Sequence, residues 1–323
     1  MLTRSMSQPR PYLSFSISLF AVFVALSTAV TPRLAHASSP LVVDDDGQAT
    51  ATNCNAVTPA FNTIQAAVNA AAPGDTILVC PGAYDEQLVV RTSNLTIRGT
   101  GASLTMLRPS VVSPIITDLN FGVPMRPILL VDHAAGVTVS DLKIDGSIAD
   151  GGAPAVPSCE FPTIGAYVGI YYRNSSGKVE ATHVTNMRSA TVCTRGFLSE
   201  SDLAGTSNVV LNGNLFDNYG EVGISCVRPN TNCTVTGNTV RGRGPVDDEG
   251  QAGITVRAAA AATISGNVIT DHYFLPRRLK GPMGGIAAIA VGILLVAVDP
   301  STHPHILRDN IFANNELNVQ RID

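Results

Sequence analysis

The chain has 323 residues and a formal net charge of −4, and only 14% of its residues are charged. It has no basic face or tail, which argues against nucleic acid as a partner. Aromatic residues make up 5%, tryptophan is absent and glycine occurs 28 times, a composition that is typical of many short strands joined by tight turns.

The N-terminus has the order of a secretory signal. Arg4 and Arg10 precede an apolar run over 13–30, and Ala35-His36-Ala37 follows it. This order predicts a signal peptide over 1–37 and a mature domain over 38–323 that is secreted or held at the cell surface, with no membrane segment after cleavage. The alternative is a membrane anchor, because the run approaches the minimum length of a spanning helix.

The first folded elements are expected in residues 61–101. Phe61, Ile64, Ala67, Val68 and Ala71 fall on one face of a 3.6-residue period and predict a helix over 61–72. Pro-Gly at 73–74 ends that helix, and short β-branched runs at 75–80, 88–90 and 95–97 predict strands.

An even number of cysteines in an exported chain favours disulfides over metal binding, and the chain has no C-x-x-C pair. Proximity in the sequence predicts the pairs Cys54–Cys80, Cys159–Cys193 and Cys226–Cys233, although other connectivities are open.

Two motifs recur through the rest of the chain. One is a hexad with a central asparagine at Asn214, Asn238, Asn267 and Asn310, with Thr182 in the same place of a weaker copy. The other is a glycine that opens a strand, followed by an apolar residue, at Gly169, Gly196, Gly223, Gly253 and Gly292. We call the second group the Gly-Ile strands, and align Pro127-Ile128 as their first copy. Each repeat thus contains strand, loop, strand, tight turn and strand.

Such a repeat cannot bury its apolar face alone, but coils stacked about 4.8 Å apart give every strand a parallel neighbour. The asparagines are expected in the left-handed conformation, bonded from coil to coil in a ladder. The sequence therefore predicts an all-β, right-handed parallel β-helix of about eight coils with a short N-terminal capping helix.

The repeats resemble the pectin lyase-like superfamily. The stretch with Thr63-Ile64-Gln65, Gly82, Tyr84 and Glu86 is similar to the opening of pectin methylesterases. That resemblance implies a capped coil end and the first rung, and says little about the reaction. The catalytic motifs of pectin methylesterases, polygalacturonases and alginate epimerases are mostly missing, since the chain lacks tryptophan and has Ser after Asp299-Pro300.

In β-helices of this superfamily the substrate lies along the outer face of the Gly-Ile strands. The fourth residues after the glycines should point outward there, which makes Arg173 and Glu200 stacked neighbours, with Arg257 two coils further on and Arg228 one step from the same row. With His272 from a preceding loop, these are the predicted substrate-binding residues, since guanidinium groups suit the carboxylates of an acidic polysaccharide. The alternative is a solvated surface ion pair.

The loops before the Gly-Ile strands carry Asp217, Asp247, Asp248 and Asp271, the predicted catalytic candidates. Two carboxylates could hydrolyse a glycosidic bond, and several could hold Ca²⁺ for elimination, although no metal ligand set can be named. The alternative is that these acids only keep the loops soluble.

We therefore expect a secreted protein that binds an acidic extracellular polysaccharide, and the sequence leaves open whether it also cleaves it as a lyase or hydrolase. The rival hypothesis is a non-catalytic extracellular structural or adhesion module. A periplasmic accessory protein similar to copper-site maturation factors is a third class, which scarce Met and His disfavour.

Overall fold

The computed structural model describes residues 40–119, 122–147, 165–189, 192–246, 250–275, 290–297 and 305–322. They belong to one compact unit, Ser38–Asp323. The signal peptide predicted over 1–37 lies outside the described residues, so its cleavage stays a prediction. None of the described helices is long and apolar enough to cross a membrane.

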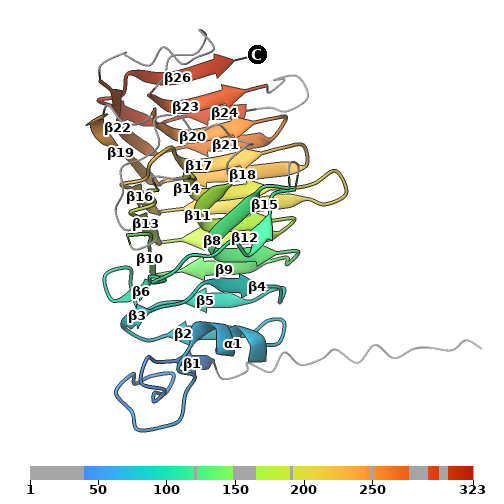
Figure 1. Cartoon of the computed structure of the whole chain (residues 1–323), viewed down its shortest axis with the longest axis vertical. Helices are drawn as coiled ribbons and strands as arrows, with labels where there is room; N and C mark the ends of the chain where they lie inside the picture. The colour runs from blue at the N-terminus through green and yellow to red at the C-terminus, as the bar shows by residue number, and fades with distance from the viewer. Residues whose placement is uncertain are drawn as a thin grey trace, which may run out of the picture. The chain divides into compact units, whose positions relative to one another are not determined.

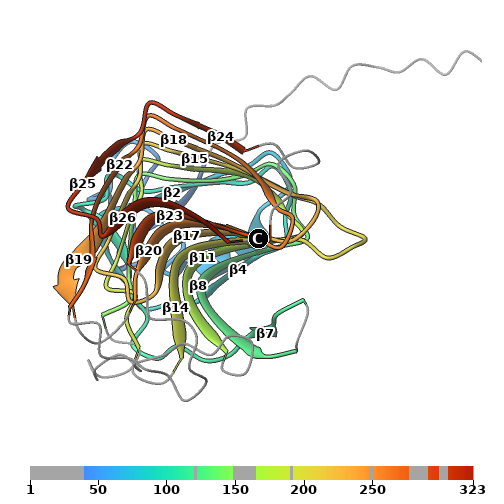
Figure 2. The ribbon, with the colours of Figure 1, turned by 90° about the horizontal axis from the view of Figure 1, so that it is seen from above.

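Three parallel sheets run along a stack of coils (Figure 1) and together enclose the core (Figure 2). Sheet 1 contains β1 (Leu41–Val43), β2 (Thr76–Val79), β5 (Thr96–Arg98), β9 (Val137–Ser140), β12 (Ser176–Glu180), β15 (Ser207–Asn212), β18 (Thr231–Thr236), β21 (Ala261–Ser265) and β24 (His305–Arg308). Sheet 2 contains β3 (Gly82–Tyr84), β6 (Thr105–Leu107), β10 (Lys143–Asp145), β13 (His183–Thr185), β16 (Leu215–Asp217), β19 (Thr239–Val246), β22 (Val268–Phe274) and β25 (Ile311–Ala313).

Sheet 3 holds the Gly-Ile strands. It contains β4 (Leu88–Val90), β8 (Pro124–Asp132), β11 (Ala166–Arg173), β14 (Cys193–Glu200), β17 (Val222–Val227), β20 (Ala252–Arg257), β23 (Val291–Val296) and β26 (Leu317–Ile322), with β7 (Ile116–Thr117) antiparallel to β8. The chain passes through sheets 1, 2 and 3 in turn, and the described residues complete this circuit eight times, from β2–β3–β4 to β24–β25–β26. The predicted β-helix of about eight coils is confirmed.

The core is built from rows of identical positions on successive coils. One row in sheet 1 is aligned by backbone register and completely buried: Ile77, Ile97, Val139, Val179, Leu211, Val235 and Ile264. Because alternate residues of a strand face the same side, each such row is one apolar stripe of the repeat. Stacking therefore buries what a single repeat would leave in water.

Helix α1 (Ile64–Ala70) covers the N-terminal end of the stack, as predicted (Figure 1). It is shorter than the predicted 61–72 because Thr63 is its N-cap, with a side chain that accepts from the Ala66 amide at 3.2 Å. The Glu86 carboxylate accepts from the Ile64 and Gln65 amides at 2.7 and 2.8 Å. A carboxylate at this position satisfies free amides of the first helical turn.

The predicted asparagine ladder is present. The side-chain amides of Asn214, Asn238 and Asn267 each donate to the next asparagine along the stack, at 2.9, 3.0 and 2.9 Å, ending at Asn310. The left-handed conformation, however, belongs to the preceding residue, as at Gly213, Gly237 and Gly266. The expectation for the asparagines was wrong in this respect, because the residue before them makes the turn and frees their side chains for the ladder.

A second ladder was not predicted. Asn218 donates to Asn186 and Asn186 to Asp145, and further along the stack Asn314 donates to Asp271 at 3.0 Å. All of these except Asp145 are left-handed, with φ between 47° and 64°. Asn and Asp tolerate this conformation better than other side chains, so the corner after sheet 2 uses them in place of glycine.

The disulfides Cys54–Cys80 and Cys226–Cys233 are confirmed, with Cα atoms 5.7 and 6.5 Å apart. Cys193 is also disulfide-bonded. Its predicted partner, Cys159, lies outside the described residues.

Candidate functional site

Outward-facing side chains form a row at the carboxyl ends of the sheet 3 strands. Backbone register aligns Arg173 with Glu200, Glu200 with Val227, and Val227 with Arg257. This is the stacking that the sequence predicts, and Arg228 directly follows Val227. Neighbouring positions of the row are separated by one strand spacing, about 4.8 Å.

One member of the row was missed because the predicted alignment of β8 was wrong by one residue. Aligning Pro127-Ile128 with Gly169-Ile170 assigns Val131 to the row, but the structure pairs Leu129 with Ile170 and Asp132 with Arg173. A one-residue shift moves every side chain of a strand to its other face. Asp132 therefore belongs to the row, and Arg91, which follows the Val131 partner Val90, lies beside it.

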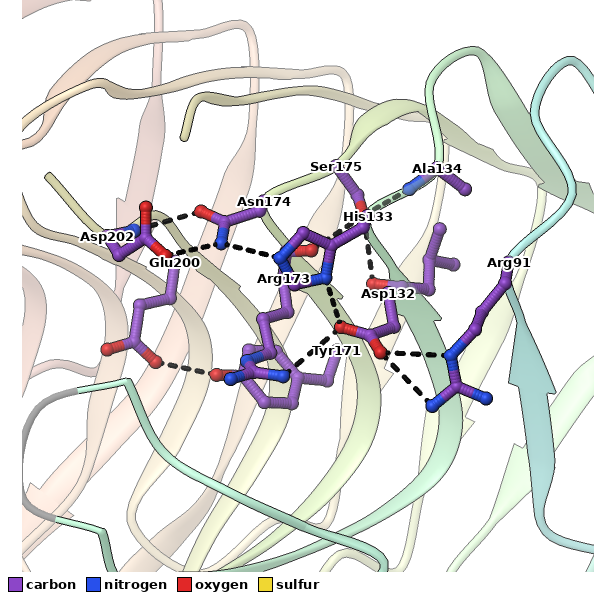
Figure 3. A network of polar contacts seen from close by, with 11 residues as sticks. Arg91, Asp132, His133, Ala134, Tyr171, Arg173, Asn174, Ser175, Glu200 and Asp202 are labelled. Atoms are coloured by element: carbon purple, nitrogen blue, oxygen red, sulfur yellow. Dashed lines mark hydrogen bonds and ion pairs between the residues drawn. The ribbon is translucent and has the colours of Figure 1, made fainter. Parts of the chain in front are cut away.

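We call Arg91, Arg173, Arg228 and Arg257 the arginine row, and Asp132 and Glu200 its acids. Figure 3 shows Arg91, Arg173 and the two acids. Asp132 binds Arg91 at 3.1 Å through one carboxylate oxygen and Arg173 at 3.2 Å through the other. Glu200 binds Arg228 at 2.5 Å. The acids are buried and the side chains of Arg173 and Arg228 are mostly buried, whereas the Arg91 side chain is 65% exposed.

Asp132 also orients an exposed histidine. His133 Nδ1 lies 2.8 Å from Asp132 Oδ1, and Asn174 Nδ2 lies 3.2 Å from His133 Nε2 and 2.9 Å from an Asp202 carboxylate oxygen (Figure 3). Because an amide nitrogen only donates, Nε2 must accept and the proton of the neutral ring is on Nδ1. The sequence showed Asp132-His133 only as an isolated dipeptide and gave no signal for this chain of contacts.

Glu200 is the buried centre of the row. Its second carboxylate oxygen accepts from the Tyr171 hydroxyl at 2.6 Å. Burial raises the pKa of Glu200 above its ordinary value, and the bonds from Tyr171 and Arg228 oppose that shift. Burial and the Glu200 charge raise the pKa of Tyr171, so its hydroxyl remains a donor. Tyr171 was not predicted, because its role depends on a contact between coils.

Arg257 differs from the other members. Among the described residues its guanidinium makes no hydrogen bond or ion pair, although it interacts electrostatically with Arg195 and Glu221. Burial, and then the positive charge of Arg195, lowers the pKa of Arg257. On the same strand and face, the Thr255 hydroxyl donates to Ser225 at 3.0 Å. An unpaired guanidinium next to a second one is a favourable site for an anionic group.

The middle of the outer face of sheet 3 is not the open groove that the sequence predicts. Leu130, Tyr171 and Leu198 belong to a second apolar cluster outside the coil, each 3% exposed or less. Ile116 of β7 and Val123 pack against this cluster. In the described part of the chain, the connection before β8 folds back over these strands and closes this stretch of the face, whereas Arg91 at the edge is exposed.

The two predicted catalytic acids that the structure describes, Asp217 and Asp271, do not lie on this face. Asp217 is in β16 of sheet 2, bound to His183 Nε2 at 2.9 Å and to Arg241 at 2.7 Å. Bonds from these two side chains and Thr185 outweigh burial and lower the Asp217 pKa. This carboxylate stays ionised and is unsuited to donate a proton.

Asp271 is in β22 of sheet 2, two coils beyond Asp217, where it binds Thr270 and accepts from Asn314. The structure therefore does not bring Asp217 and Asp271 together. The other two predicted acids, Asp247 and Asp248, lie outside the described residues. In the described part of the chain, no group of three or more His, Cys, Asp or Glu side chains could hold a metal ion.

His272 was predicted to bind substrate, which requires an exposed side chain. The structure instead places it inside the coil. It is completely buried, with Nδ1 2.8 Å from Asn315 Oδ1 and Nε2 bonded to the Tyr219 hydroxyl. Because side chains alternate between the two faces of β22, His272 points into the coil. Its position after Asp271 in a basic stretch of the sequence gave no sign of this.

His272 should make the fold sensitive to acid. Burial lowers its pKa from 6.5 to about 4, so the unfolded chain binds the proton more tightly. This stabilisation is present above pH 6.5 and is lost as the pH falls toward 4, by about 3 kcal/mol in total. Urea unfolding at pH 7 and 4.5 should show this loss in the wild type and a smaller one in His272→Gln. Equal losses in both would contradict the assignment.

Comparisons with known proteins place the fold. A family model described as the right handed beta helix region matches residues 127–297. Pectin methylesterase PemA from Erwinia chrysanthemi shares 11% identity at a TM-score of 0.39, over 82% of this chain and 92% of that one. An alginate lyase from Paenibacillus sp. shares 13% identity at a TM-score of 0.34, and the match covers 79% of this chain and 96% of that one. Similarities of this degree carry no information about activity. A search of curated proteins found no match.

Proposed function

This chain belongs to the right handed beta helix region family, and from that premise we propose that it binds an acidic extracellular polysaccharide at the arginine row. The observation that carries the proposal is the unpaired guanidinium of Arg257, which lies in register with the paired members of the row. A guanidinium without a carboxylate partner is available for a carboxylate from outside the protein.

The charge of the row supports this choice of ligand. Four arginines face two acids, so the row carries 4 − 2 = +2 on a chain whose net charge is −4. The row also repeats along the stack at the strand spacing, which suits a polymer better than a small ligand. Secretion, which the proposal requires, is supported by the predicted signal peptide and by the disulfides Cys54–Cys80 and Cys226–Cys233.

Cleavage is a second candidate function, favoured by Glu200. A carboxyl group with a raised pKa can act as a general acid, and Asp132 is a second carboxylate two strand spacings away, about 10 Å between Cα atoms. That spacing is comparable with the wider carboxylate separation of inverting glycoside hydrolases. Ca²⁺-assisted elimination is the other route, and it would draw on Asp247 and Asp248.

The rival is a non-catalytic structural or adhesion module. It is supported by the completeness of the ion pairs at Asp132 and Glu200, which leaves these acids bonded on both oxygens. Polygalacturonate and alginate, each with and without Ca²⁺, separate the possibilities. New reducing ends indicate hydrolysis, ultraviolet absorbance of an unsaturated product indicates elimination, and binding without either leaves a binding module.

Arg257→Gln should weaken binding to a polyuronate by roughly ten- to a hundredfold, because a charge-assisted hydrogen bond contributes about 1.5–3 kcal/mol. Affinity electrophoresis or calorimetry at low salt measures the change. Arg98→Gln is the matched control, since Arg98 is an exposed arginine at the end of β5 in sheet 1. An equal loss in both variants, or equal wild-type affinity for an uncharged glucan, would refute a specific role for the row.

A further inference from the structure

His133 is an exposed histidine at the edge of sheet 3, and both of its ring nitrogens have a partner (Figure 3). Its side chain is 59% exposed, next to the exposed Arg91. The two side chains bind opposite oxygens of Asp132, His133 at 2.8 Å and Arg91 at 3.1 Å. Solvent therefore reaches a histidine and an arginine that share one buried carboxylate.

The backbone does not require a histidine at this corner. His133 is left-handed, with φ 55°, and its amide donates to the Arg173 carbonyl of the next coil at 3.0 Å. Ala258 has a left-handed conformation at the equivalent corner, and its amide donates to the Val296 carbonyl at 3.0 Å. An alanine is thus sufficient for the turn, so the fold alone does not explain the imidazole of His133.

Asn174 determines how the His133 ring can bond. Its Oδ1 accepts from the Asp202 amide and its Nδ2 donates to the Asp202 carboxylate, both at 2.9 Å. The amide group of Asn174 cannot turn over, because Oδ1 would then meet a carboxylate and Nδ2 would meet an N–H group. The Asn174 nitrogen therefore faces His133 Nε2, which can accept from it only while the ring is neutral.

Protonation of His133 changes what this corner offers to a ligand. Nε2 then carries a proton that the Asn174 nitrogen cannot accept, while Nδ1 keeps its bond to Asp132. The charged groups around the ring are Arg91, Arg173, Asp132 and Asp202. Their formal charges sum to 2 − 2 = 0, so protonation of the ring raises the net charge of the corner to 3 − 2 = +1. A charged N–H group is then available for an anionic acceptor from outside the protein.

We propose that protonated His133 and Arg91 form a subsite for a carboxylate of the polysaccharide, which accepts from Nε2–H of the imidazole. The subsite rests on the proposed function, because it extends the arginine row to the corner after β8. Histidine is the side chain that ordinarily changes charge between pH 5 and 8, whereas arginine stays charged throughout this range. The protein should therefore bind an acidic polymer more tightly in a mildly acidic medium than in a neutral one.

The test is the affinity of the full chain for polygalacturonate at pH 7.5 and 5.5, at the same low salt concentration. Carboxylates with an ordinary pKa, about 4, remain ionised at both pH values. The wild type should bind roughly three- to tenfold more tightly at pH 5.5, because the new bond is charge-assisted but partly exposed. His133→Asn should lose this gain and still fold, since Asn174 is left-handed at the next corner. His183→Asn, on sheet 2, should keep the gain.

Equal wild-type affinity at the two pH values overturns the proposal, and so does an equal gain in His133→Asn, since another group would then carry the pH dependence. In either case, binding at pH 7.5 that Arg257→Gln weakens still supports the arginine row. No binding at either pH refutes both the row and the subsite. NMR titration gives a second measurement: with a polygalacturonate oligomer bound, the His133 ring should keep its proton to a higher pH, because the coupling between proton and ligand is reciprocal. An unchanged titration of His133 contradicts the subsite.

Discussion

Asn238→Ala is expected to lower the free energy of unfolding by about 3–5 kcal/mol, because Asn238 is the buried centre of the asparagine ladder. It is 1% exposed. Its carbonyl oxygen accepts from both the backbone and side-chain amides of Asn214, at 3.0 and 2.9 Å, and its amide donates to Leu211 O at 3.0 Å. Alanine leaves these groups unsatisfied in a site that water does not reach.

The end of the same ladder supplies the control. Asn310 accepts from Asn267 and donates to the Ile264 carbonyl at 2.9 Å, but it is partly exposed, so water can replace the lost bonds in Asn310→Ala. We expect a loss of about 1–2 kcal/mol there. Asn238→Thr should lie between the two, since Thr182 occupies the equivalent position two coils earlier. Guanidinium unfolding followed by circular dichroism measures all three, and equal losses at 238 and 310 would contradict the account.

Much of the fold could be predicted because its signals recur within each coil. The Asn214, Asn238 and Asn267 hexads and the glycines of sheet 3 repeat once per coil, so the strands, their order and their parallel stacking follow from the spacing alone. The right-handed parallel β-helix is confirmed, as are two of the disulfides. The second ladder was missed because its members have no fixed hexad around them.

The candidate site was less predictable, because its geometry depends on contacts between coils. Arg173 and Glu200 were identified since strand alternation fixes which residues face outward. Asp132 was missed because β8 lacks the glycine that marks the other Gly-Ile strands, and its predicted alignment was therefore wrong by one residue. The closure of the outer face by Ile116, and the inward turn of His272, arise from packing that no local pattern records.

These differences change where a ligand can bind. A groove along the middle of sheet 3 would expose the full length of each strand to a ligand. In the structure the ligand can instead bind at the edge of the sheet, where exposed Arg91 and unpaired Arg257 lie on different coils. The bonded pair of Tyr171 and Glu200 lies between them along the stack. A bound polymer would therefore contact the ends of the strands and the corners that follow them, such as His133 and Asn174.

Gly223→Ala should cost at least about 3 kcal/mol, because a methyl group there meets the backbone of the next coil. A Cβ at Gly223 would lie 2.7 Å from the Gly253 carbonyl oxygen, 2.8 Å from Val240 Cγ1 and 2.9 Å from Tyr219 Cζ. The glycines of the neighbouring Gly-Ile strands have the same contact with the next carbonyl, at 2.5–2.6 Å for Gly169, Gly196 and Gly253. The repeated glycine is thus required by the close approach of coils rather than by a turn.

Gly213→Ala separates this effect from backbone strain. Gly213 has φ +65 and no atom within 4 Å of an added Cβ, so alanine there should cost only the left-handed conformation, about 1–2 kcal/mol. Gly213→Asp should cost less than Gly213→Ala, because Asp141 and Asp309 hold a left-handed conformation at the equivalent turns. Gly223→Asp, in contrast, should be at least as harmful as Gly223→Ala. If Gly223→Ala unfolds at the same denaturant concentration as Gly213→Ala, the coils can separate to admit a methyl group and close packing does not explain the repeated glycine.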